Sequence, residues 1–183
     1  MDNKITLKKF FGHLHTVNIH RFRVFKLCCK VGIPIQGLLH DLSKYNPQEF
    51  WEGVRYFQGT YSPIKNCKTS IGYSKAWIHH KGRNKHHYEY WYDYNAPVVA
   101  PMMPFKYFLE LVCDTYAAGM TYCKEGWTPK YQEDYWKKVR DQAIIHPDMR
   151  KLLDKVYNDG TKYGLKVILK KKYLKDLYNR YNK

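Results

Sequence analysis

An adjacent histidine and aspartate, His40 and Asp41, form the stretch of this 183-residue chain that could most directly do chemistry. An imidazole and a carboxylate side by side are good ligands for a divalent transition metal. Lys44 follows three residues after Asp41, so on a helix its ammonium group would project near the same point. A metal and a cation together favour an anionic, phosphate-bearing substrate. A polar pair at a helix end is the alternative interpretation.

His20 lies on an apolar seam within residues 6–31, which the spacing of apolar residues predicts to be a helix. A histidine on such a stripe, like His13 here, is more often a hydrogen-bonded core residue than a ligand. His20 becomes a candidate ligand because His40 and Asp41 follow it by twenty residues. The seam steps by three or four residues and consists of Val17, Val24, Leu27 and Val31.

The His-Asp pair itself should be positioned by a second helix. Gly32 is expected to end the first helix and Pro34 to open the next. We expect this second helix to bury its leucines and thereby hold the pair against the core. These leucines are Leu38, Leu39 and Leu42.

Four of the nine histidines fall within nine residues, between positions 79 and 87. They could be ligands for a second metal, because neutral imidazole is the commonest nitrogen ligand in proteins. Alternatively, the cations among them could form an anion pocket, or the segment could be an exposed basic loop. The histidines are His79, His80, His86 and His87, and the cations are Lys81, Arg83 and Lys85.

Asp114 supplies a carboxylate on a helix predicted to begin at Pro104 and end near Lys124. It shares a helix face with Leu111 and other apolar or small residues. A buried carboxylate without a partner is costly, so Asp114 requires a cation or a metal. Glu110, one turn earlier, could accept a hydrogen bond from a ligand, but we expect it to be exposed.

The remaining pattern is also helical, and no strand-like alternation of any length occurs. Further helices are predicted after Asn46, from Ser74 and after Thr128, with loops at 59–72 and 93–103, and His146 is expected to cap a helix. A last helix, from about Lys162 to Tyr181, carries many lysines. This basic face is either a solvated surface or a surface for nucleic acid or an anionic membrane.

Composition limits the classes of partner. The formal charge of +16 favours anionic partners, although it could also reflect the composition of the source genome. Eighteen tyrosines and five tryptophans among the lysines would suit stacking on nucleic-acid bases. Five cysteines without a Cys-x-x-Cys pair are typical of reduced thiols. We expect a cytoplasmic protein without a signal peptide or a membrane span.

In order along the chain, the candidates His20, His40-Asp41, the 79–87 histidines and Asp114 resemble the ligands of the HD-domain superfamily of metal-dependent phosphohydrolases. Residues 40–44, His-Asp-Leu-Ser-Lys, look like its signature motif. The resemblance covers residues 8–155 and is closer still to a bacterial and phage branch, the DUF5662 family, through the segment from His79 to Trp91. No Gly-Tyr-Pro follows His79-His80, which argues against cleavage of cyclic dinucleotides.

The resemblance implies an all-α fold, an HD-domain-like helical bundle with a metal site in its core. It assigns the first metal to His20, His40, Asp41 and Asp114. Asp41 would bridge to a second metal held by one of His79 and His80 and one of His86 and His87. One or two divalent ions are expected, from Mn, Fe, Zn, Co or Ni. The domain would span residues 1–160, and the basic helix at 161–183 would pack on it or extend it.

The implied function is hydrolysis of a phosphate ester, such as a nucleotide or a sugar phosphate, by metal-activated water. Asp41 and Lys44 are the candidate catalytic residues, and Lys44 and Arg83 would bind the anionic substrate. Two alternatives stay open. One is a mixed-valent di-iron oxygenase of the same superfamily, and the other is a non-catalytic protein that binds nucleic acid through its basic surface.

Overall fold

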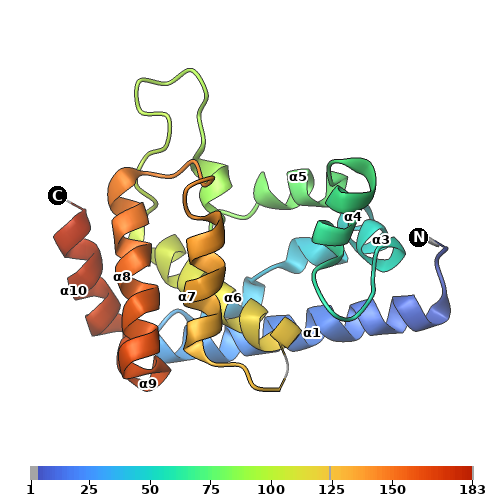
Figure 1. The fold of residues 1–183 in the computed structure, drawn as a ribbon, viewed down its shortest axis with the longest axis horizontal. Coiled ribbons are helices and arrows are strands. Elements are labelled where there is room, and N and C mark those ends of the chain that lie inside the picture. The colour runs from blue at the N-terminus through green and yellow to red at the C-terminus, as the bar shows by residue number, and fades with distance from the viewer. Residues whose placement is uncertain (1–3, 124, 183) are drawn as a thin grey trace.

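A computed structural model describes residues 4–123 and 125–182 and confirms the all-α prediction for them. Ten α-helices and two 3₁₀ turns follow one another, and no strand occurs within these two ranges (Figure 1). The elements are α1 (Leu7–Lys30), α2 (Pro34–Leu39), η1 (Leu42–Tyr45), α3 (Pro47–Arg55), α4 (Pro63–Ile71), α5 (Lys75–Lys81), η2 (Tyr88–Trp91), α6 (Phe105–Cys123), α7 (Pro129–Val139), α8 (Pro147–Tyr163), α9 (Leu165–Ile168) and α10 (Lys171–Tyr181).

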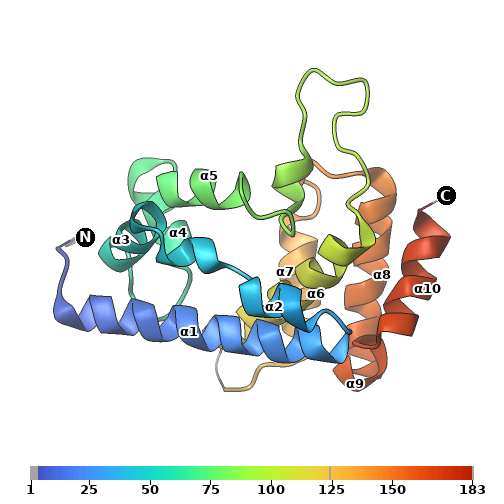
Figure 2. The same ribbon diagram turned by 180° about the vertical axis from the view of Figure 1, so that it is seen from behind.

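The long helix α1 runs along one side of the molecule, and other helices pack over both of its halves. Helices α3, α4 and α5 gather over its N-terminal half, whereas α6, α7, α8 and α10 gather over its C-terminal half (Figures 1 and 2). Most of the apolar core lies over the C-terminal half of α1, where Phe108 and Tyr116 of α6 pack with Leu152 and Tyr157 of α8. The histidine-rich segments lie between the two groups of helices.

Helix α1 buries the face that the apolar seam predicts. Thr6 caps it, accepting a hydrogen bond from the Lys9 amide at 3.2 Å. His13 and His20 are buried on the same face as the seam residues. The seam therefore holds His20 on the inner side of α1, facing α2 and α6.

The expectation that leucines anchor the His-Asp pair is wrong. Leu38, Leu39 and Leu42 are 59%, 57% and 49% exposed. Helix α2 is instead held through Gly37, which packs so closely on α1 that a Cβ atom there would lie 2.4 Å from the Cβ of Cys28. Arg21 of α1 also donates hydrogen bonds to the carbonyls of His40 and Leu38, both at 2.8 Å. Backbone contact, rather than leucine burial, positions the pair.

Replacing Gly37 by alanine should therefore displace α2 from α1. The added methyl group overlaps Cys28, and overpacking of this kind costs about 1–3 kcal/mol of folding free energy. Thermal unfolding should show a clear drop in Tm. Gly82→Ala is the matched control, because its new Cβ would lie 3.3 Å from the Ile78 carbonyl oxygen and 3.9 Å from that of His79, without the severe overlap found at Gly37. Equal melting temperatures for the two variants would contradict this account of how α2 is held.

Two other predicted boundaries differ from the structure. The segment 59–72 is not only a loop, because α4 forms there, with Pro63 in its first turn and Gly72 as a left-handed cap. Its buried positions are taken by Pro63, Asn66 and Cys67 rather than by large apolar residues, which explains the weak periodicity. The last predicted helix is divided, since α8 ends at Tyr163 with Gly164 as its cap, at a φ of 78°, and α10 begins only at Lys171. Lys124, the predicted end of the Asp114 helix, lies outside the described residues.

Helix α10 packs on α6 and α8 through Leu174, Leu177 and Tyr178, and the Tyr178 hydroxyl donates to the Met103 carbonyl at 2.7 Å. Its lysines face outward. Among the described residues, none of the helices is both long enough and apolar enough to cross a membrane.

Candidate metal centre

Seven imidazole and carboxylate side chains from five segments meet between the two groups of helices. All except the half-buried His87 are buried, although the segments span almost a hundred positions of sequence. The side chains are His20 of α1, His40 and Asp41 after α2, His80 of α5, His86 and His87 before η2, and Asp114 of α6.

Asp41 lies at the centre of this cluster. It is the one non-glycine residue of the described chain with a positive φ, 54°, because the backbone turns sharply between α2 and η1. Left-handed backbone at a residue other than glycine costs free energy and is often found at functional sites. The turn directs the Asp41 carboxylate inward, so that its two oxygens face different sets of histidines.

The first set surrounds Asp41 Oδ2. His20 Nε2 lies 3.4 Å from this oxygen and 3.0 Å from Asp114 Oδ1. His40 Nε2 lies 3.1 Å from the same Asp41 oxygen and 3.5 Å from Asp114 Oδ1. Two nitrogens and two oxygens thus surround one small space, and these four residues could together hold an ion.

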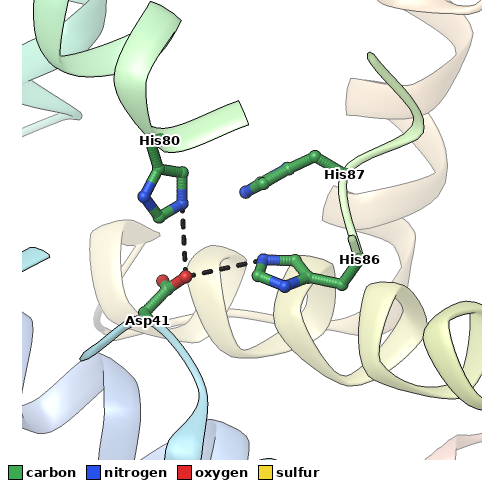
Figure 3. Close-up of side chains that lie close together, drawn as sticks. All are labelled: Asp41, His80, His86 and His87. Carbon is green, nitrogen blue, oxygen red and sulfur yellow. Dashed lines mark ion pairs between the residues drawn. The ribbon is translucent and has the colours of Figure 1, made fainter. Parts of the chain in front are cut away.

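The second set surrounds Asp41 Oδ1. His80 Nε2 lies 3.2 Å from this oxygen and His86 Nε2 lies 3.5 Å from it. Figure 3 shows the His87 ring directed into the space between the His80 and His86 rings. The ligand atoms of Asp41, His80, His86 and His87 lie within 4.8 Å of one another, so a second ion could be held there with Asp41 shared.

The unpaired polar atoms of this cluster fit a bound metal. The Nε2 atoms of His20, His40, His86 and His87 and Asp41 Oδ1 are buried, and none has a hydrogen-bond partner among the described residues. These atoms lie near carboxylate oxygens, yet they are not aligned as hydrogen-bond donors and acceptors. Buried polar atoms without partners are costly. Metal coordination would satisfy these atoms, because an ion bound within each ligand set would accept their lone pairs.

The ionisation states also suit coordination. Burial alone would raise the pKa of Asp41, but the nearby charges of His40 and Lys44 hold it well below its usual range. The pKa of Asp114 is likewise lowered, because its interactions with the nearby His20 and His40 imidazoles outweigh burial. Lys44 Nζ pairs directly with Asp41 Oδ2. Both carboxylates are therefore ionised and available as ligands near neutral pH.

Glu110 is not exposed, contrary to the sequence-based expectation. It is only 5% exposed, and its Oε1 accepts a hydrogen bond from His40 Nδ1 at 2.8 Å and lies 3.1 Å from His86 Nδ1. Burial opposes ionisation, yet the hydrogen bonds from His40 and His86 lower the pKa of Glu110 to about 2. An ionised Glu110 accepts from Nδ1 of each imidazole, so Nε2 is the nitrogen that faces the other candidate ligands and would bind a metal in place of a proton.

Glu49 has the same role on the other side of the cluster, and sequence reasoning missed it. Its Oε2 accepts from His80 Nδ1 at 2.7 Å, and its Oε1 accepts from His79 Nδ1 at 2.6 Å. The only sequence signal was a glutamate three residues after the helix cap Asn46, which is equally typical of a purely structural residue. His79 is thus directed to Glu49 and lies in neither set of candidate ligands.

Replacing Glu110 by glutamine should weaken metal binding while preserving the fold. The neutral amide cannot hold both Nδ1 protons as an ionised carboxylate does, and loss of such a partner typically reduces metal affinity by about ten- to hundredfold. Competition with a chromophoric chelator would measure the change. Glu133→Gln is the matched control, since Glu133 is also buried but pairs with Lys137 on α7. An affinity for metal equal in both variants would show that Glu110 does not orient the ligands.

A cleft of about 610 Å³ reaches the cluster from outside, and His40, Asp41 and His86 form part of its lining. Arg83, the predicted substrate-binding residue, also lines this cleft. Lys44 contacts the cluster itself through Asp41. The cleft therefore connects the candidate ligands with solvent beside a cationic side chain.

A model of the DUF5662 family, described as a family of unknown function, matches residues 9–159. The chain belongs to this family. The DUF5662 match includes every residue of both ligand sets, from His20 to Asp114, and stops before α9 and α10. No curated protein and no solved structure shows significant similarity to this DUF5662 chain.

Proposed function

We propose that this DUF5662 protein is a metal-dependent phosphohydrolase that acts on a phosphate ester, a nucleotide or a small phosphorylated metabolite. The observation that carries the proposal is the pair of ligand sets that share Asp41, with buried Nε2 atoms that lack partners. The cationic cleft beside them supports an anionic substrate.

The order of the candidate ligands supports a relationship with the HD-domain superfamily. His20, His40-Asp41, His80, His86-His87 and Asp114 occur in the sequence order of the superfamily's ligands. In this assignment His20, His40, Asp41 and Asp114 hold one ion, and Asp41, His80, His86 and His87 hold the other. His79 is left as a partner of Glu49.

Divalent ions at this site would activate a water molecule for attack and polarise the phosphoryl oxygens. The protein's own side chains position the ligands and supply positive charge. Asp41 fixes the relative position of the two ligand sets, while Glu49 and Glu110 accept from Nδ1 of His80 and His40 and so direct their Nε2 atoms toward the ions. Lys44 remains protonated because Asp41 raises its pKa, so it provides a positive charge next to the reacting group. Arg83 adds a second cation at the cleft.

Reconstitution would test this function. Protein stripped with a chelator and loaded separately with Mn, Fe(II), Zn, Co or Ni would be assayed for phosphate release from nucleoside monophosphates, sugar phosphates and para-nitrophenyl phosphate. We expect release with at least one metal and none in the stripped protein. A protein that retains metal but releases phosphate from none of these esters would contradict the proposal.

The shared carboxylate and the nitrogen-rich ligand sets also suit two iron ions, which keeps an O2-dependent oxygenase as a second candidate. Oxygen uptake by anaerobically purified, iron-loaded protein against a substrate panel would distinguish it. Nucleic-acid binding through the outward lysines of α10 would be steeply salt-dependent and would survive loss of the ligands. Binding without salt dependence would exclude that role.

A further inference from the structure

The cleft beside the candidate metal centre has two walls of opposite character. One wall comes from the start and end of α2 and includes Ile33, Pro34, Ile35 and Leu39. Ile35 is 75% exposed and Leu39 is 57% exposed, although both are large apolar side chains next to a hollow. Contiguous apolar surface left in water beside a cleft is typical of a ligand-binding wall.

The other part of the lining is cationic and comes from the turn after α5 and the start of α6. Arg83, Lys85 and Lys106 line it, together with Tyr107. Lys85 Nζ lies 5.9 Å and Lys106 Nζ 4.8 Å from the centre of the Tyr107 ring, so both ammonium groups are held near one aromatic side chain. Within the described chain, none of the three cations forms an ion pair with a carboxylate, which leaves their charges available to a ligand.

The inner end of the cleft includes His40, Asp41 and His86, which belong to the two ligand sets. A phosphate held at the metal centre would therefore leave the rest of its molecule between the two walls. An apolar portion would cover Ile35 and Leu39, and a second anion would be attracted by Lys85 and Lys106.

We propose that this cleft selects phosphate esters whose organic group carries both an apolar portion and a second anionic group. The inference rests on the proposed function, because it places the scissile phosphate at the metal centre. It narrows the substrate class, since a compact ester such as a small polyol phosphate would leave Ile35 and Leu39 in water. An ester with a single phosphate would leave Lys85 and Lys106 without an anionic partner.

Three phosphonates, which cannot be hydrolysed, would test the selection by binding. They are methylphosphonate, benzylphosphonate and para-sulfobenzylphosphonate, titrated into metal-loaded protein by calorimetry. We expect benzylphosphonate to bind about tenfold more tightly than methylphosphonate, as is usual for a small apolar group in a fitted pocket. The sulfonate should add about fivefold, in the range of partly exposed ion pairs.

Two variants would assign these gains to the two walls. Ile35→Ser should reduce the benzyl preference several-fold, and Lys85→Gln/Lys106→Gln should remove the sulfonate preference, with metal content unchanged in both. The matched controls are Ile144→Ser, at a 52% exposed isoleucine away from the cleft, and Lys172→Gln/Lys175→Gln on α10. The controls should keep the wild-type order of affinities.

The corresponding phosphate esters, tested for phosphate release, would separate this inference from the proposed function. Hydrolysis of all three esters together with equal affinities for the three phosphonates would overturn the cleft inference and leave the proposed function standing. Affinities in the expected order without phosphate release from any ester would support the cleft and contradict the hydrolase. Wild-type preferences in the cleft variants would also overturn the inference.

Discussion

Replacing Asp41 by alanine should remove the bound metal and abolish phosphate release, with a loss of at least about a thousandfold in kcat/KM. The reason is that Asp41 belongs to both ligand sets, with one oxygen facing His20 and His40 and the other facing His80 and His86. Metal content by elemental analysis and phosphate release by a colorimetric assay would fall together.

Asp41→Asn gives a control for the unusual backbone at this position. Asparagine tolerates a φ of 54° better than alanine does, so this variant should fold normally while losing the ligand charge. We expect it to lose metal as Asp41→Ala does, with a Tm closer to wild type than that of the alanine variant. Asp148→Asn, at the start of α8, should retain metal and activity. Full metal occupancy and turnover in either Asp41 variant would refute the assignment.

Alanine substitution at the neighbouring residues His79 and His80 should have very different effects on metal content and activity. Both donate through Nδ1 to Glu49, but only His80 directs Nε2 toward Asp41, at 3.2 Å. His80→Ala should reduce the metal content from two ions to one per chain and lower kcat/KM by about a hundredfold or more, because one metal no longer completes the site. His79→Ala should keep both ions.

The comparison also controls for stability, since each variant removes one buried imidazole and one hydrogen bond to Glu49. His80 Nδ1 also lies 3.1 Å from Ser43 Oγ and 3.2 Å from Asn84 Nδ2. Thermal unfolding in the metal-free state should therefore show a loss for both variants, with the larger loss for His80→Ala. A metal content that falls in His79→Ala and not in His80→Ala would reverse the assignment of the ligand.

The sequence predicted the helical class and the elements that carry Asp114 and His20, because these helices are long and bury one periodic face. The sequence could not show which of the adjacent His79 and His80 directs Nε2 toward Asp41. Neighbouring positions on a helix differ by about 100° in direction. Both rings donate to Glu49, and only the folded position of Asp41 beside His80 Nε2 distinguishes the two histidines.

The supporting residues were harder to predict than the candidate ligands. Glu110 and Glu49 lie on helices where a polar residue is normally exposed, and their burial depends on contacts with histidines 24 to 70 positions away. The exposure of Leu38 and Leu39 on α2 was likewise not predictable from the sequence pattern. Their apolar character suggested a core position, whereas the close approach at Gly37 turns that face of the helix outward.

Diffraction from crystals of the protein at the absorption edges of the candidate metals would show whether the two ligand sets bind ions. We expect anomalous peaks between His20, His40 and Asp114 and between His80, His86 and His87, with Asp41 between the two. Crystals that hold no metal at either position, even after soaking with Mn and Zn, would contradict this expectation.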